Sequence, residues 1–129
     1  MVRSISPANV PHHKNPIPAA AIHKNVLASS AISGIDPNTG EFPENKEEQV
    51  ALAYEHLNSI LNEAGAKPQD IVKMDLYFAD KSDRSLVNKI WLELFPDADA
   101  RPARHAHSAD LQPGCIFQIE ILAILDNRS

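Results

Sequence analysis

Residues 45–80 read NKEEQVALAYEHLNSILNEAGAKPQDIVKMDLYFAD, and this stretch decides the fold because it joins a long helix to a strand. Asn45 and Glu48 have the spacing of a capping box, and Gly65 is a typical residue just beyond a helix C-terminus. These signals predict a helix over residues 46–64. Its apolar positions recur at helical intervals and are Val50, Tyr54, Leu57, Ile60, Leu61 and Ala64.

The end of the stretch alternates apolar and polar side chains, which is the period of a strand with one buried face. The apolar set is Val72, Met74, Leu76 and Phe78, and the polar set is Lys73, Asp75 and Tyr77. A second helix is predicted directly afterwards, capped by Ser82 or Asp83. Its apolar stripe consists of Leu86, Val87, Ile90, Trp91, Leu94 and Phe95.

The flanking segments complete a sheet. The prolines of residues 7–18 predict an extended arm, and residues 25–34 predict a short strand that enters a turn at IDPNTG. Residues 103–109 and 116–125 are consistent with two further strands. The order is therefore β, β, α, β, α, β, β, and we expect an α+β two-layer sandwich with one mixed sheet and two helices packed on one face.

The length of 129 residues fits a single domain, in which residues 1–24 hold the proline-rich arm and the first strand. Because both helices are expected on one face of the sheet, the other face needs a cover. The last strand, at residues 116–125, is apolar on both sides. We therefore expect self-association through the open face.

The composition disfavours several classes of function. A formal net charge of −5 argues against sequence-independent nucleic-acid binding, because no basic patch can neutralise several phosphates. The single cysteine, Cys115, cannot form an intrachain disulfide and fits a reducing compartment. No apolar run reaches about 18 residues, so we expect no membrane span and a soluble cytoplasmic protein.

Arg104 and Glu120 are the strongest candidates for chemistry. The planar guanidinium of an arginine can hold a carboxylate through two parallel hydrogen bonds. Glu120 lies in an apolar strand, where a carboxylate without a partner is costly. Together the two residues could bind an acid and handle a water molecule. The alternative is that they simply pair with each other across strands.

His105 and His107 are two residues apart, so both rings project from the same face of a strand. With Asp110 they could hold a divalent metal ion, but a third ligand is not evident from the sequence. We therefore expect no metal. Ser30 has no histidine and acid at a readable spacing, and the glycines form no phosphate loop.

Several motifs together resemble the Rid family of enamine and imine deaminases, also called YjgF and formerly endoribonuclease L-PSP. They are the DPNTGE turn, EEQ at the start of the long helix, LNEAGAKPQDIVK at its end, the dipeptide Val87-Asn88, and PAR followed by IE in the last strand. The resemblance covers roughly residues 25–125. It implies a chorismate-mutase-like homotrimer with ligand clefts between subunits, which would also cover the open sheet face.

The resemblance also implies an activity, namely hydrolysis of reactive 2-imino or 2-enamino carboxylic acids to 2-oxo acids and ammonia, without a metal or cofactor. Arg104 would hold the substrate carboxylate, and Glu120 would orient the attacking water. The other substrate-binding residues that it implies are Ser30, Ala31, Asn88, Ile17 and His105.

The chain departs from the family pattern at several of these positions. The usual G-P-Y segment reads N-P-I, so Ile17 stands in place of the family tyrosine. The usual S-G-Q segment reads S-A-I from Ser30, and His105 and Ala106 follow PAR where serine and cysteine are common. These changes favour a pathway-specific substrate, such as an aminomuconate-like or aminoacrylate-like enamine.

Two other classes of function compete with the deaminase. A non-catalytic protein that senses a small carboxylate, such as a 2-oxo acid, would use Arg104 in the same way. A ribonuclease, suggested by the older family name, is disfavoured by the acidic charge balance and by the lack of base-stacking aromatic residues near Arg104 in the sequence.

Overall fold

The computed structural model describes residues 1–126 of the chain. Its elements in chain order are β1 (Arg3–Ile5), β2 (Ala20–His23), β3 (Val26–Ser29), β4 (Ile32–Ser33), α1 (Lys46–Ala64), η1 (Pro68–Asp70), β5 (Ile71–Phe78), η2 (Lys81–Val87), α2 (Asn88–Leu94), β6 (Ala103–Ser108) and β7 (Phe117–Ile124). The elements η1 and η2 are 3₁₀ helices. Within this part of the chain, no helix is long and apolar enough to cross a bilayer.

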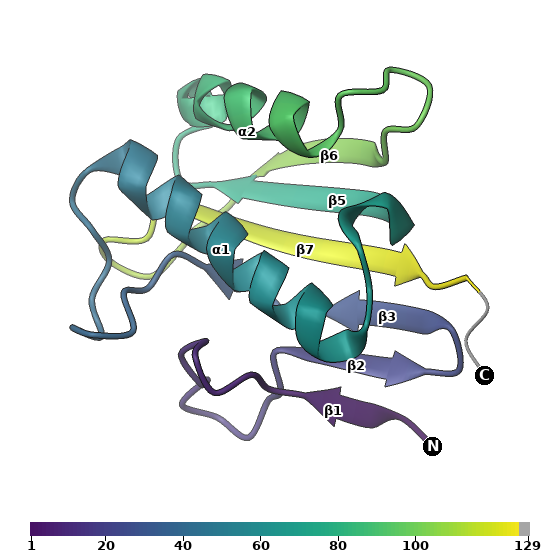
Figure 1. Ribbon diagram of the computed structural model, residues 1–129. Coiled ribbons are helices and arrows are strands. Elements are labelled where there is room, and N and C mark those ends of the chain that lie inside the picture. Colours follow the sequence, from purple (N-terminus) through teal and green to yellow (C-terminus); the bar gives the residue numbers. More distant parts are fainter. Residues whose placement is uncertain (127–129) are drawn as a thin grey trace.

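The strands form one mixed sheet in the order β1-β2-β3-β7-β5-β6, and β4 pairs with β7 beside this path. Strands β5 and β6 run parallel, while the other pairs are antiparallel. Both α-helices lie on one face of the sheet (Figure 1). We call the opposite face, which none of the helices in residues 1–126 covers, the open face. The expected α+β architecture with one mixed sheet and two helices is confirmed.

Helix α1 begins and ends where its sequence signals predict. The Asn45 side chain accepts a hydrogen bond from the Glu48 backbone N–H at 2.9 Å, and Gly65 follows the helix in the left-handed conformation with a φ of 73°. The predicted helix at 46–64 is therefore confirmed. Its apolar side and the sheet share one buried core, which includes Leu57, Ile60, Leu61, Met74, Leu76, Phe117 and Ile119.

Strand β5 covers the predicted residues, but the prediction for its first apolar position is wrong. Val72 is 47% exposed, whereas Ile71 is buried. The pairing of β5 with β7 shifts in register between Ile71 and Lys73, so an irregularity at the start of the strand breaks the alternation. After it, the alternation follows the prediction, with Met74, Leu76 and Phe78 buried.

The predicted second helix consists of two pieces, η2 and α2, and the prediction of its cap is wrong. Neither Ser82 nor Asp83 caps it. Instead the Asp80 carboxylate accepts a hydrogen bond from the Ser82 backbone N–H at 2.9 Å. Hydrogen bonds from Ser82 hold the pKa of Asp80 below its ordinary value. An aspartate bonded to the backbone two residues ahead forms a tight turn, which suits the 3₁₀ start of the segment.

The N-terminal part of the chain holds more strands than expected. Residues 1–24 contain both β1 and β2, and the strand predicted at 25–34 is split into β3 and β4. Lys24, in the tight turn between β2 and β3, has a φ of 54°. Residues 7–18 form no strand or helix, as their prolines predict.

The buried side chain of Gln49 joins α1 to the segment before β7. Its Nε2 donates to the carbonyl oxygens of Pro43 and Gly114, both at 3.0 Å, and its Oε1 accepts from the Ile116 backbone N–H at 2.8 Å. We predict that Gln49→Leu lowers the free energy of unfolding by about 2 kcal/mol or more, because leucine leaves these backbone groups without partners. Urea unfolding followed by circular dichroism measures the change.

A matched control is Gln69→Leu, which makes the same replacement at an exposed position of η1. It should leave the free energy of unfolding within about 0.5 kcal/mol of the wild type. Equal unfolding midpoints for the two variants would show that the Gln49 amide contributes nothing beyond its apolar volume.

Candidate functional site

Arg104 lies on the edge strand β6, on the face that carries the helices. In the parallel pairing of β5 with β6 it lies opposite Met74, which is fully buried. Its Nη2 donates to Asn88 Oδ1 at 3.4 Å, and its guanidinium carbon lies 4.9 Å from the centroid of the Trp91 ring. Both partners belong to α2. The helix therefore orients the guanidinium while the side chain stays exposed.

The charge of Arg104 also acts on Tyr54 in α1. Burial raises the pKa of Tyr54, and the Arg104 charge opposes this rise. The protonated Tyr54 hydroxyl donates to Met74 Sδ at 3.6 Å. Because none of these neighbours is a carboxylate, the Arg104 charge is not neutralised by them. The guanidinium is thus equipped to hold an anion from solvent, and its planar shape suits a carboxylate.

Glu120 lies on β7 and points to the open face. It is opposite Asp75 of β5, while its sequence neighbours Ile119 and Ile121 are buried on the helix side. Hydrogen bonding to Glu120 is the largest cause that raises the pKa of Tyr77 to about 12, followed by burial and by the charges of Glu120 and Asp75. A half-buried carboxylate with a hydroxyl partner avoids the cost of a lone charge in the core.

Arg104 and Glu120 do not pair with each other in one chain. Strand β5 lies between their strands, and Arg104 is opposite Met74 whereas Glu120 is opposite Asp75, on the other face. The ion pairs found in residues 1–126 join Lys46 to Asp83, Lys73 to Asp75 and His107 to Asp75. The alternative of a purely structural Arg104–Glu120 pair is therefore wrong for the single chain.

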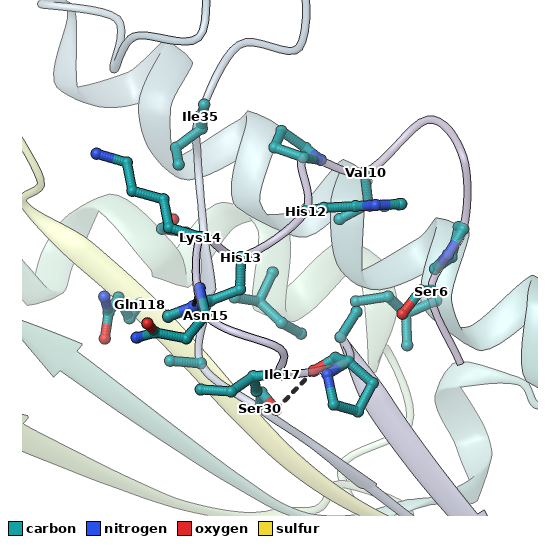
Figure 2. A pocket seen from close by; sticks show the side chains of 18 of the residues that line it. Ser6, Val10, His12, His13, Lys14, Asn15, Ile17, Ser30, Ile35 and Gln118 are labelled. Carbon is teal, nitrogen blue, oxygen red and sulfur yellow. Dashed lines mark hydrogen bonds between the residues drawn. The ribbon is translucent and has the colours of Figure 1, made fainter. Parts of the chain in front are cut away.

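Ser30, Ala31 and Ile17 lie together at a pocket of about 840 Å³ between the N-terminal arm and the sheet (Figure 2). The Ser30 hydroxyl donates to the Pro18 carbonyl at 2.8 Å, and the Ser30 backbone N–H donates to the Ala19 carbonyl at 2.9 Å. These two hydrogen bonds attach the end of the N-terminal arm to Ser30. The polar side of the pocket includes His12, His13, Lys14, Asn15 and Gln118.

The sequence does not single out Trp91, Asp75 or Tyr77 as site residues, yet each contacts a candidate. Trp91 reads as part of an apolar stripe, and it corrects the expectation that no aromatic residue lies near Arg104. Asp75 and Tyr77 read as the solvated side of a strand. Their position opposite β7 depends on strand pairing, which no local sequence pattern indicates. The pocket on the arm is likewise formed by distant segments.

His105 and His107 project from β6 on the open face, with ring centroids 4.0 Å apart. His107 Nε2 lies 2.9 Å from Asp75 Oδ1, and the His107 ring stacks on Tyr77 with centroids 4.6 Å apart. The potential ligand atoms of Asp75, His105 and His107 all lie within 4.8 Å of one another. The third potential ligand, which the sequence did not reveal, is thus Asp75 on the neighbouring strand, and not Asp110.

The candidate residues fall into separate groups within one chain. Arg104 and Asn88 lie at the β6 edge, whereas Ser30 directly follows β3, and β7 and β5 lie between those two strands. Glu120 and His105 are on the open face. A single cleft that contains Arg104 and Ser30 therefore requires a second copy of the chain.

Comparison with known proteins places these features in context. The family model described as Endoribonuclease L-PSP matches residues 9–125. A protein named RutC family protein from Aquifex aeolicus is 32% identical over 124 residues, which are 95% of this chain and 99% of that protein. Reactive Intermediate Deaminase A, chloroplastic, from Arabidopsis thaliana is 29% identical over 123 residues, which are 94% of this chain and 65% of that protein.

The fold is also similar to a solved structure. The crystal structure of the YjgF gene product from E. coli superposes with a TM-score of 0.83 at 27% sequence identity. The match covers 95% of this chain and 98% of that one. The shared architecture therefore extends over nearly the whole length of both chains.

Proposed function

Because the chain belongs to the Rid family, also called YjgF, L-PSP or RutC, we propose that it hydrolyses reactive 2-imino and 2-enamino carboxylic acids to 2-oxo acids and ammonia. The observation that carries the proposal is Arg104, an exposed guanidinium that Asn88 and Trp91 orient and that pairs with no carboxylate of residues 1–126. Such a group suits a small acid whose carboxylate must be held while the neighbouring carbon reacts.

The chemistry needs one water molecule and two proton movements. Water adds to the C=N carbon of the imine, and the two protons of that water pass in turn to the nitrogen, which leaves as ammonia while the C=O of the 2-oxo acid forms. An enamine first gains a proton on carbon and loses one from nitrogen, and so becomes the imine. Glu120 would accept the proton of the attacking water, and Arg104 would keep the substrate carboxylate in place. No metal or cofactor is needed for these steps.

The cleft of this proposal lies between subunits of a homotrimer. One subunit would supply the β6 edge with Arg104 and Asn88, and a neighbour would supply the pocket with Ser30, Ala31 and Ile17. Support comes from the open face, where the apolar side chains Val26 and Leu122 are 40% and 38% exposed. Burial of this face between subunits would remove that apolar surface from water.

We predict that the protein in solution has three times the chain mass of 14.2 kDa. The assembly should persist at micromolar concentration, because the unpaired β6 edge and the open face both lie at the surface of one chain. Size-exclusion chromatography with light scattering measures the mass. A monomeric mass would contradict the trimer and remove the intersubunit cleft.

The activity is tested with imines made in the assay. An amino-acid oxidase converts an amino acid to its 2-imino acid, and semicarbazide competes with water for this product. A deaminase speeds ammonia release and lowers the yield of trapped imine. Aminoacrylate-like and aminomuconate-like enamines, generated in the same way by suitable enzymes, compare the substrate classes. Unchanged hydrolysis of every imine and enamine would contradict the proposal.

A carboxylate sensor is the second candidate, favoured by Ile17, which cannot supply the hydroxyl of the family tyrosine. It predicts saturable thermal stabilisation by 2-oxo acids without turnover. The ribonuclease suggested by the family description is disfavoured by the net charge of −5. Intact RNA after incubation at physiological salt would agree with this conclusion.

A further inference from the structure

Three side chains of the types that bind metal ions lie close together on the open face. Only one of them, His105, is also among the residues that would hold the substrate in the proposed deaminase. Asp75 and His105 are paired residues on the parallel strands β5 and β6, and His107 is two residues further along on the same face. Their potential ligand atoms lie within 4.8 Å of one another, and His107 Nε2 is 2.9 Å from Asp75 Oδ1.

We propose that Asp75, His105 and His107 bind a divalent transition-metal ion, with zinc as the best fit. A tetrahedral zinc centre has bonds of about 2.0 Å, which place its ligand atoms about 3.3 Å apart. His107 Nε2 and Asp75 Oδ1 are 2.9 Å apart and all three potential ligand atoms lie within 4.8 Å of one another, so side-chain rotations would complete the site. Two imidazoles and one carboxylate also leave a fourth position open to water.

The surroundings of the cluster favour a cation. Glu120 is opposite Asp75 on the other neighbouring strand, so two carboxylates lie side by side on this face. The Tyr77 ring stacks on His107 with an interplanar angle of 13° and restricts the orientation of the imidazole. Lys73 Nζ is 3.9 Å from Asp75 Oδ1, but its side chain is 42% exposed and can move aside.

The ligand set also defines the class of ion. Imidazole nitrogens favour zinc, cobalt, nickel and copper, whereas magnesium and calcium prefer all-oxygen sites. In the single chain, the side chains of Asp75 and His107 are 26% and 30% exposed. A simple hydrogen-bonded pair of His107 with Asp75 is the competing explanation, and it makes no use of His105. The two explanations therefore differ in what His105→Ala does.

The test uses tag-free protein that has been stripped with a chelator and then dialysed. Calorimetric titration with zinc should show one ion per chain, and magnesium should give no saturable heat. His105→Ala and His107→Ala should each weaken zinc binding more than about 10-fold, since even residues that only support a ligand contribute 10-fold or more. Cobalt should give the visible absorption of a tetrahedral site, lost in both variants.

His23→Ala is the matched control, because His23 is an exposed histidine on β2 outside the cluster. It should bind zinc as the wild type does. If His107→Ala fails to fold, as judged by circular dichroism, His105→Ala decides the matter, since His105 is exposed. Absence of saturable zinc binding, or zinc binding that survives His105→Ala unchanged, would overturn the proposal. Neither result depends on deaminase activity.

Discussion

Arg104→Ala should reduce kcat/KM for any imino or enamino acid that the wild type hydrolyses by about 30-fold or more, while the fold and the assembly persist. The substrate carboxylate is a full charge, and loss of a bidentate charged partner in a partly desolvated cleft costs about 2–5 kcal/mol. Arg104 is exposed and its contacts are with Asn88 and Trp91 on the surface helix, so its truncation leaves the core intact. The imine assay measures kcat/KM, and light scattering checks the mass.

Two further variants sharpen this prediction. Arg104→Lys should restore little activity, because an ammonium cannot reproduce two parallel hydrogen bonds or lie flat on the Trp91 ring. Arg84→Ala removes an exposed arginine of η2 and should leave the kinetics unchanged. Near wild-type kinetics for Arg104→Ala would mean that another residue holds the acid, even if the deaminase activity itself is real.

The parts of the fold that were predictable carry their signals locally. Helix α1 is set by Asn45 before it and Gly65 after it, and both act within one turn of the helix ends. The exposure of Val72 could not be predicted, because the irregularity depends on how β5 pairs with β7. The start of η2 was missed for a different reason: Asp80, Ser82 and Asp83 are all good capping residues, and the sequence does not rank them.

The candidate site was predictable to the extent that single residues reveal their chemistry. An arginine in PAR and a glutamate inside an apolar strand are unusual enough to be noticed one at a time. Their positions on opposite faces follow from the registers of β5 with β6 and β7, which no local pattern encodes. The same holds for Asp75, which is 30 or more residues away in sequence from the histidines that it approaches.

These positions also bear on the assembly. If both Arg104 and Glu120 act on one substrate, a single chain cannot bring them together, since β5 and the sheet itself lie between them. The deaminase proposal therefore requires an oligomer, whereas a sensor that uses only Arg104 does not. A monomeric protein with saturable 2-oxo acid binding would favour the sensor over the enzyme.

Glu120→Gln should lower kcat by about 100-fold or more and change KM little, because general-base catalysis contributes typically 10²–10⁴-fold. The amide keeps the shape of the carboxylate and can still accept a hydrogen bond from Tyr77, but it cannot take a proton from the attacking water. Arg104 still holds the substrate in this variant, so binding is spared. Steady-state kinetics with the generated imine separate kcat from KM, and Glu55→Gln, at an exposed position of α1, is the matched control.

The effect of Glu120 on Tyr77 can also be measured without turnover, through the titration of the Tyr77 hydroxyl. The pKa of Tyr77 is raised to about 12 from the ordinary 10.0, chiefly by hydrogen bonding to Glu120, and the charge of Glu120 adds to the rise. Neutralising Glu120 removes the charge that disfavours the tyrosinate, so the pKa of Tyr77 should fall toward its ordinary value in Glu120→Gln. Ultraviolet absorbance of tyrosinate follows this titration, and Tyr77→Phe identifies the signal because the only other tyrosine, Tyr54, is buried. An unchanged tyrosinate titration would show that the Glu120 charge does not act on Tyr77 in solution. A lowered pKa with unchanged kcat would show that the contact exists but that Glu120 is not the base.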